Sequence, residues 1–392
     1  MRWRNRGHEF DTEWIFRKKL IIFGCGNRGK AFLQLYRRYI TSDEDLAFFD
    51  NHSGLWGKKV DGIIVKNPDN LKSEKSCVIV VTPDKGKGIE IASQLESYGL
   101  IRNSDYFFLH DFVNDYLKAW ILYRWEYLID DYVQISLTER CTLKCKYCAH
   151  SCPYRPRGTD DELTYSEAQK SVDMYFNIVD YCDSFDILGG EPLLCSYLNR
   201  LLNYIGDKYR DRIGSLTITT NATIIPDGEI LRSCCKYDVE FLISDYRHNI
   251  DDFSKKAKSL SERLDDNEIS YKYVYSGSSK WVDFGFLDVN ENELYGLKTF
   301  NECKSTCREI RRNKYYYCIM ARCASEVLLD DIGISDYLDL KLLDKDSLND
   351  KLVFYEYSHG FSEKGYLEVC KHCRGLNASE QWLIWPGEQL QK

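Results

Sequence analysis

Hydrophobic residues in the first part of the chain form short runs, separated by polar segments and by stretches with helical spacing. The runs lie at residues 20–23, 46–49, 63–65, 77–81 and 106–109. Segments 31–36 and 89–95 carry apolar residues three and four positions apart, as one buried face of a helix requires. Strands that alternate with such helices predict a parallel sheet. We therefore expect residues 1–115 to form an α/β domain with a doubly wound, Rossmann-like sheet.

The same rhythm returns in the middle of the chain. Candidate strands lie at residues 133–137, 185–188, 216–220, 241–244, 271–275 and 282–286. Helical segments such as 165–179 and 198–209 separate most of them. The pattern predicts six strand–helix units over residues 133–300, with functional groups at the carboxyl ends of the strands. Residues 116–132, rich in Tyr, Trp and Leu, are expected to form a connecting helix that packs between domains.

Three cysteines follow the first strand of the second region. Cys141, Cys145 and Cys148 form a C-x3-C-x2-C run, so that three thiolates of one loop can face a single object. Soft sulfur ligands favour zinc, copper(I) or an iron–sulfur cluster. A closed site needs four protein ligands, whereas a cubane held by three would leave one iron open. The alternative is a zinc loop completed by His150 or Cys152.

The cysteine loop resembles the cluster motif of the radical SAM superfamily, including Tyr147 just before the third cysteine. Gly189, Gly190, Glu191 and Pro192 resemble the family's Gly-Gly-Glu-Pro strand end. The resemblance implies a partial (β/α)6 TIM-like barrel, a [4Fe–4S] cluster, S-adenosylmethionine at its open iron, and radical chemistry supplied by that cofactor. Two glycines allow close approach of a ligand, and the neighbouring carboxylate can accept from its ammonium group.

The same resemblance implies further cofactor contacts at strand ends. Thr219, Asn221 and Ser244 match positions that in the family often contact the ribose or carboxylate of S-adenosylmethionine. The alternative for each is ordinary turn chemistry, because Asn and Ser side chains bond to nearby backbone at strand ends. An external reductant such as flavodoxin or ferredoxin would supply the electron.

A glycine-rich turn follows the first strand of the chain. Gly24, Gly26 and Gly29 form G-x-G-x-x-G between a strand and a helix, and Asp50 ends the next strand, where it could hold a ribose hydroxyl. The region resembles small Rossmann-like domains of bacterial glycan-biosynthesis enzymes, in which such a strand ends in Asp-Asn. The expectation is a nucleotide pocket, and the alternative is a domain that binds no ligand or docks a partner.

The third region, residues 301–378, is rich in cysteine. Its candidate ligands are Cys303, Cys318, Cys370 and Cys373. Their spacing resembles SPASM and twitch modules, which implies a small cluster-binding domain with a second [4Fe–4S] cluster. Cys307 competes with Cys303 for the first position, Asn313 stands where the family usually has glycine, and a four-thiolate zinc site is the alternative. Arg308, Arg311, Arg312 and Lys314 are interpreted as a solvated basic face, and residues 379–392 as a tail.

Composition narrows the setting in which this chemistry would take place. The 392 residues carry a net charge of −8 and no basic stripe, so a nucleic-acid surface is not expected. No apolar run is long enough to span a membrane. Sixteen cysteines without a secretory signal indicate metal ligands and free thiols in the reducing cytoplasm.

Two classes of function remain. The favoured one is a radical SAM enzyme that abstracts a hydrogen atom and oxidises or epimerises a carbohydrate or nucleotide-linked small molecule. A SPASM-type maturase acting on a peptide is its variant, and an epimerase would also need a cysteine as hydrogen donor. The second class is a non-catalytic scaffold whose cysteine loops hold zinc.

Overall fold

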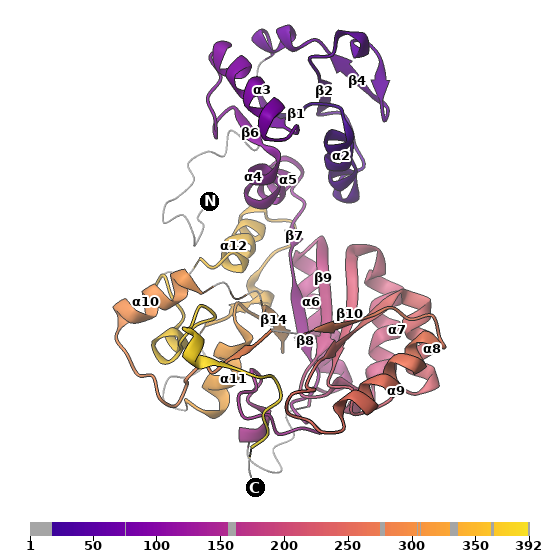
Figure 1. The fold of residues 1–392 in the computed structure, drawn as a ribbon, viewed down its shortest axis with the longest axis vertical. Coiled ribbons are helices and arrows are strands. Elements are labelled where there is room, and N and C mark those ends of the chain that lie inside the picture. The colour runs from indigo at the N-terminus through magenta and orange to yellow at the C-terminus, as the bar shows by residue number, and fades with distance from the viewer. Residues whose placement is uncertain are drawn as a thin grey trace. The chain divides into compact units, whose positions relative to one another are not determined.

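The computed structural model describes residues 18–74, 76–155, 162–274, 279–303, 305, 307–329, 336–361 and 364–390. The chain divides into two compact units, with the boundary after Leu128. Tyr275, the last residue of one expected strand, lies outside the described residues. Each unit is an α/β structure (Figure 1).

The first unit contains a sheet of six strands in the order β3-β4-β2-β1-β5-β6. Its strands are β1 (Lys19–Phe23), β2 (Leu46–Phe49), β3 (Lys59–Val60), β4 (Ile63–Lys66), β5 (Cys77–Val81) and β6 (Tyr106–Phe108). Neighbours are parallel except β3 and β4, which form an antiparallel edge. The strand order runs outward from β1 in both directions, as in a doubly wound sheet.

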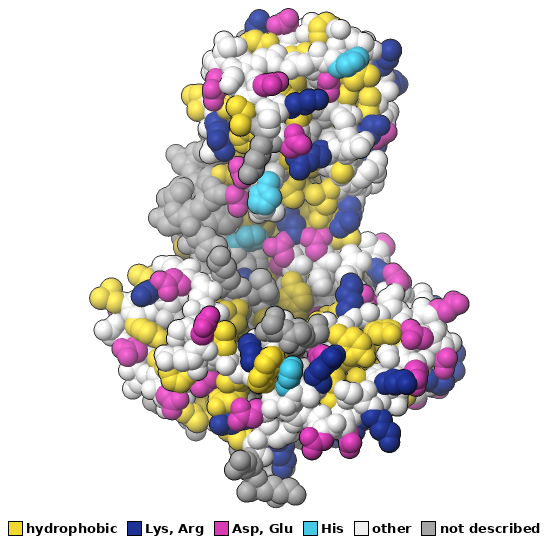
Figure 2. All heavy atoms as spheres, in the orientation of Figure 1, with side chains coloured by type: hydrophobic (Ala, Val, Ile, Leu, Met, Phe, Trp, Pro, Cys, Tyr) yellow, Lys and Arg dark blue, Asp and Glu magenta, His cyan; other side chains and the backbone are white. Residues whose placement is uncertain are grey.

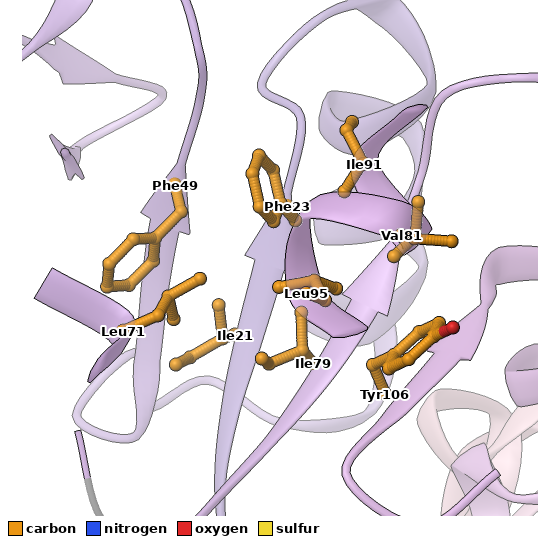
Figure 3. Packing of buried hydrophobic residues seen from close by; sticks show 10 residues of the cluster. Ile21, Phe23, Phe49, Leu71, Ile79, Val81, Ile91, Leu95 and Tyr106 are labelled. Atoms are coloured by element: carbon orange, nitrogen blue, oxygen red, sulfur yellow. The ribbon is translucent and has the colours of Figure 1, made fainter. Parts of the chain in front are cut away.

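The core of this unit lies between the sheet and α3 (Lys85–Ser97). Figure 3 shows Ile21 and Phe23 of β1 beside Ile79 and Val81 of β5, with Leu95 of α3 against them. These strands are apolar at nearly every position because both faces of a central parallel strand are covered. The continuous apolar runs that predicted the strands therefore have a direct structural cause.

The glycine-rich turn lies between β1 and α2 (Asn27–Tyr39). Gly24 has a φ of +100°, which a residue with a side chain rarely adopts. A Cβ on Gly29 would lie 2.0 Å from the carbonyl oxygen of Gly24. The third glycine is therefore needed for the packing of α2 against the turn.

The boundary between the units falls later than the predicted residue 115. Helices α4 (Leu109–Asp115) and α5 (Leu117–Trp125) both belong to the first unit. Trp120 of α5 is fully buried, and its ring lies 5.9 Å from that of Tyr36 in α2. The aromatic stripe expected to pack between domains thus packs on this unit's own helix.

The second unit contains the strand order β12-β11-β10-β9-β8-β14-β15-β16. Its strands are β7 (Ile129–Asp130), β8 (Val133–Ser136), β9 (Tyr181–Leu188), β10 (Ile213–Thr220), β11 (Val239–Ser244), β12 (Tyr271–Val274), β14 (Glu309–Arg311), β15 (Lys314–Tyr316) and β16 (Leu338–Asp339). Strands β8 to β12 are parallel, as the sequence predicts. Among the described residues, the helices beside them are α6 (Tyr165–Ile178), α7 (Leu198–Tyr209), α8 (Gly228–Tyr237) and α9 (Phe253–Asp265) (Figure 1).

The two faces of this sheet differ in polarity. Phe185 of β9 stacks on Phe176 of α6, so its face meets the helices. Successive side chains of a strand point to opposite faces of the sheet, so Asp186, next to Phe185, points away from the helices. Gln134 of β8 and Thr217 of β10 are paired with Asp186 and lie on the same face. The face turned away from the helices is therefore polar, although these three side chains are buried.

The sixth expected strand, 282–286, does not join the parallel sheet. Only β13 (Trp281–Val282) forms there, and it pairs antiparallel with β17 (Leu383–Ile384). Strand β14 instead lies parallel beside β8. Residues 379–390, interpreted as a tail, thus supply a strand whose pairing no local pattern could reveal.

The remaining elements surround the cysteines of the third region. Its helices are α10 (Glu293–Glu302), α11 (Ile319–Val327) and α12 (Leu348–Ser358), with a short 3-10 helix at Glu368–His372. Asn313 has a φ of +64° in the two-residue turn from β14 to β15. Asn therefore adopts here the positive φ that such a turn needs and that glycine would otherwise supply.

The surface and the helices add two observations. No helix among the described residues combines the length and apolar character needed to cross a membrane. Figure 2 shows basic and acidic side chains interspersed over the face that it displays, in keeping with the mixed charge of the sequence.

The packing at Gly29 leads to a stability prediction. Gly29→Ala should lower the free energy of unfolding by about 1–3 kcal/mol, because the new methyl group meets a rigid carbonyl. Gly86→Ala, in the first turn of α3 with nothing within 4 Å, should be neutral or slightly stabilising. Urea denaturation of the full chain measures the free energy of unfolding of both variants. An equal change in the two would contradict the packing assigned to Gly29.

Candidate active site

The cysteine loop leaves β8 and passes directly over the end of β9. The backbone N–H of Gly190 donates to the Thr138 carbonyl at 2.7 Å, and that of Glu191 donates to the Arg140 carbonyl at 2.8 Å. These two bonds fix the entrance of the loop just before Cys141. The carboxyl ends of two neighbouring parallel strands thus place the loop.

The glycine pair makes this close approach possible. A Cβ on Gly189 would lie 2.2 Å from the Thr138 carbonyl oxygen, and one on Gly190 would lie 2.2 Å from that of Arg140. Neither position could hold a side chain without moving the entrance of the loop. The glycine pair is predicted to allow close approach of a ligand, and in the structure it allows close approach of the protein's own backbone.

The Glu191 side chain has a different environment from the one expected. It is completely buried, and its oxygens accept hydrogen bonds from the Thr220 hydroxyl and the Asn221 N–H, both at 2.9 Å. Burial raises the pKa of this carboxyl to about 7, although these donors oppose the shift. The carboxylate thus connects to the end of β10, and the contact with a ligand ammonium group stays a prediction. Pro192 is also buried and begins a 3-10 turn (Pro192–Leu194).

The three thiols of the loop lie close enough to interact electrostatically. Burial, aided by the charge of Cys148, raises the pKa of Cys141 and of Cys145 to about 12. A hydrogen bond from Cys152 lowers the pKa of Cys148 to about 6 against the effect of burial. The amide Nδ2 of Asn221 donates to Cys141 Sγ at 3.4 Å. The three neighbouring thiols, of which Cys145 is buried and the other two are half-buried, therefore form one soft ligand set that fits an iron–sulfur cluster.

The other expected cofactor contacts lie at the strand ends. Thr219 directs its hydroxyl to Asp186 at 2.8 Å, and Ser244 is buried at the end of β11. Asn221 lies between the loop and β10, and its amide also donates to the Thr142 hydroxyl at 3.1 Å. The Asn221 side chain thus holds the loop through two groups.

A cavity of about 320 Å³ lies beside the loop. Its lining includes Tyr147, Cys148, Tyr154, Asp283, Phe284 and Phe286. The rings of Phe284 and Phe286 stack with their centroids 5.5 Å apart. The aromatic residue of the cluster motif therefore borders an open space with both apolar and acidic walls.

A buried ion network lies at the entrance of the loop, and the sequence analysis missed it. Arg322 of α11 is 1% exposed, and its guanidinium lies 2.6 Å from Glu139 and within bonding distance of Glu309. Burial alone would raise the pKa of Glu139, but Arg322 holds it well below the usual range. The available signal in the sequence is the position of charged residues beside cysteines, and among these only Arg308, Arg311, Arg312 and Lys314 are interpreted as a solvated face. Arg311 belongs to this set and is 2% exposed, so the predicted basic face is wrong at that position.

Glu139, His150 and Cys323 also satisfy the distances of a three-ligand metal site, with ligand atoms within 4.8 Å of one another. His150 Nδ1 lies 3.5 Å from Glu139, and Arg155 lies 3.7 Å from the same carboxylate. Because arginines already neutralise Glu139, a further cation would meet repulsion there. We therefore interpret this group as part of the ion network.

The cysteines of the third region also come together. Cys318 directly precedes α11, Cys303 follows α10, and Cys370 and Cys373 lie in or beside the 3-10 helix. Burial raises the pKa of Cys370, and the charges of Cys373, Cys318 and Cys303 add to it. Four thiols separated by up to 70 residues are thus neighbours in space.

In the first unit, Asp50 lies beside the glycine turn but is already bonded. Its Oδ2 accepts from the backbone N–H of Cys25 at 3.0 Å and from the Cys25 thiol at 3.2 Å. Its Oδ1 accepts from the His52 N–H at 2.9 Å. The carboxylate thus stabilises the turn, and the ribose contact expected of it stays a prediction.

Comparison with known proteins agrees with this geometry. Residues 135–309 match the family described as the radical SAM superfamily. This part of the chain is therefore a radical SAM domain, and the cofactors of the family are a [4Fe–4S] cluster and S-adenosylmethionine.

Particular relatives can also be named. The chain is 24% identical over 266 residues to GTP 3',8-cyclase of Campylobacter jejuni subsp. doylei, covering 65% of this chain and 79% of the relative. It is 34% identical over 207 residues to GTP 3',8-cyclase of Sulfurimonas denitrificans, covering 46% of this chain and 63% of that protein. The crystal structure of BtrN in complex with AdoMet and 2-DOIA aligns with 67% of this chain and 97% of that one, at 13% identity and a TM-score of 0.41.

The buried network leads to a second stability prediction. Arg322→Met should lower the free energy of unfolding by about 3–5 kcal/mol, because it leaves Glu139 and Glu309 buried without a counter-charge. Arg312→Met removes an exposed ion pair with Glu167 and should cost less than about 1 kcal/mol. Urea denaturation measures the free energy of unfolding of both variants. A similar decrease in both would contradict the greater contribution assigned to the buried network.

Proposed function

We propose that Cys141, Cys145 and Cys148 hold the [4Fe–4S] cluster of this radical SAM enzyme and leave one iron open for S-adenosylmethionine. When bound there, these cofactors would supply the radical chemistry that removes a hydrogen atom from a substrate. The chain's own residues position the ligand set: Gly190 fixes the loop entrance, and Asn221 orients the Cys141 thiol. The mutual proximity of the three thiols and the burial of Cys145 support this assignment.

We propose a polar small molecule as the substrate, of the carbohydrate or nucleotide-linked class. The observation that carries this proposal is the polar inner face of the barrel. In the described part of the chain, Gln134 Nε2 and Ser136 Oγ are buried on β8 without a hydrogen-bond partner. Such donors are costly unless a ligand satisfies them. The relatives named GTP 3',8-cyclase, which take a nucleotide, support the same class.

Asp186 adds a charge to this face. It accepts from the hydroxyls of Thr217 and Thr219, both at 2.8 Å, and burial raises the pKa of its carboxyl to about 6. A carboxylate that two hydroxyls hold in place can orient hydroxyl or amino groups of a polar substrate. An apolar peptide side chain would find no matching surface on these strands, so the peptide-modifying function ranks second.

We further propose a second [4Fe–4S] cluster at Cys303, Cys318, Cys370 and Cys373. Four thiolates close the coordination of a cubane, so this site would transfer electrons or anchor the substrate. The interactions of Cys370 and Cys373 extend to Cys303, which favours Cys303 over Cys307 as the first ligand. A second cluster would accept the electron that a substrate radical loses on oxidation, and it therefore favours oxidation over epimerisation. In this division of the chain, residues 133–300 carry the radical site and 301–378 the second cluster.

Replacement of Cys141, Cys145 and Cys148 by Ala should abolish formation of 5′-deoxyadenosine. The variant should keep about four irons per chain, because one cubane remains at the second site. Iron and sulfide analysis after anaerobic preparation, with a dithionite-driven cleavage assay, measures both quantities. Zinc in place of iron at either site would favour the scaffold function, and unchanged cleavage would exclude this loop as the radical site.

The substrate class can be tested with a panel of nucleotides, nucleotide sugars, aminoglycosides and short peptides. A member of the nucleotide or carbohydrate group should stimulate 5′-deoxyadenosine formation. Gln134→Leu should then lower kcat/KM about 10-fold through the loss of one hydrogen bond. Gln381→Leu, at an exposed position, is the matched control and should leave it unchanged. Stimulation by peptides alone would overturn the proposed class.

A further inference from the structure

Residues 383–390, here called the strap, are anchored firmly to the second unit. Strand β17 pairs with β13, and the ring of Trp385 stacks on that of His248 with centroids 3.8 Å apart. The side chain of Asn249 donates to the carbonyls of Trp385 at 3.1 Å and Pro386 at 3.0 Å. The strap is therefore held in place before it reaches the cysteine loop.

Beyond this anchor, the strap pairs with the cysteine loop as an extra strand. The Lys146 N–H donates to the Glu388 carbonyl at 2.7 Å, and the Leu390 N–H donates to the Lys144 carbonyl at 2.8 Å. Cys145 and Gln389 form the antiparallel bridge between these bonds. In Figure 1 the yellow end of the chain runs beside the magenta loop that follows β8. The middle cysteine of the motif is thus paired with a residue 244 positions away.

The Gln389 side chain completes the pairing by bonding to the cysteine sulfur. Its Oε1 accepts from the Lys144 N–H at 2.8 Å, and its Nε2 donates to Cys145 Sγ at 3.3 Å and to the Gly387 carbonyl at 2.7 Å. The backbone N–H of Lys144 can only donate, so the amide oxygen must face it. The amide N–H groups must then face the sulfur and the carbonyl, and the orientation is fixed.

We propose that Gln389 is a positioning residue for the cluster: its amide holds the Cys145 thiolate in the ligand set and stabilises the reduced cluster. A hydrogen bond to a cluster thiolate withdraws electron density from the sulfur and so raises the reduction potential. The strap also connects the cysteine loop to β13 and to the segment after β11. These contacts oppose movement of the three cysteines away from one another. This inference rests on the cluster site proposed above.

Gln389→Met tests the amide without adding charge, because Met has similar length and no N–H donor. The expected results are a lower midpoint potential of the cluster and about 10-fold faster loss of its iron to a chelator. The potential is measured by an anaerobic titration of the electron paramagnetic resonance signal that changes on addition of S-adenosylmethionine, which separates this cluster from the second one. Gln389→Glu keeps an acceptor for Lys144 and should lower the midpoint further.

Glu388→Gln is the matched control. It keeps the backbone pairing and removes only the 3.5 Å ion pair with Lys146, so midpoint and iron loss should match the wild type. Hydrogen exchange of the Lys146 and Leu390 amides in the iron-free chain reports whether the strap pairs in each variant. A wild-type midpoint and iron-loss rate in both Gln389 variants would overturn the proposal, as would equal changes in Glu388→Gln. A wild type without any S-adenosylmethionine-responsive signal would instead refute the underlying cluster site.

Discussion

The close approach of two backbone segments is the constraint on which the radical site depends. Residues 138–140 lie so near Gly189 and Gly190 that a Cβ at either glycine would meet a carbonyl oxygen at 2.2 Å. The two hydrogen bonds made there fix the direction in which the chain enters the cysteine loop. Because all three thiols follow within ten residues, their placement derives from this single crossing. The Glu191 side chain then accepts hydrogen bonds from Thr220 and Asn221 at the end of β10. The carboxyl ends of β8, β9 and β10 are thus connected to one another beneath the cysteine loop.

The second support is electrostatic. Arg322 of α11, four residues after Cys318, reaches Glu139, two residues before Cys141. A buried ion pair contributes little net free energy, but the loss of one partner is costly, so such pairs resist rearrangement. The two groups of cysteines therefore share a rigid connection through neutralised buried charge. This connection would hold the two proposed cluster sites at a set separation.

Much of the architecture could be predicted from local pattern. Strands β8 to β12 and the five parallel strands of the first unit match apolar runs, because buried parallel strands need such runs. The cysteine spacing alone indicated three ligands of one object. Local pattern failed where a segment was short or its partner was remote: the run at 282–286 formed only two strand residues, and its partner came from a presumed tail. The basic residues near 311 looked solvated because their counter-charges lie far away in the sequence.

By itself, the sequence determined the ligand types, the glycine pair beside them and the order of strands and helices, since each depends on residues within one or two turns of chain. The tertiary structure decided what these residues contact. Only the fold shows that the Glu191 and Asp50 carboxylates are occupied by the protein's own donors, and that Gln389 bonds to the Cys145 sulfur. The physical reason is that a hydrogen bond between residues 244 positions apart leaves no periodic trace in the sequence, whereas burial of a strand face does.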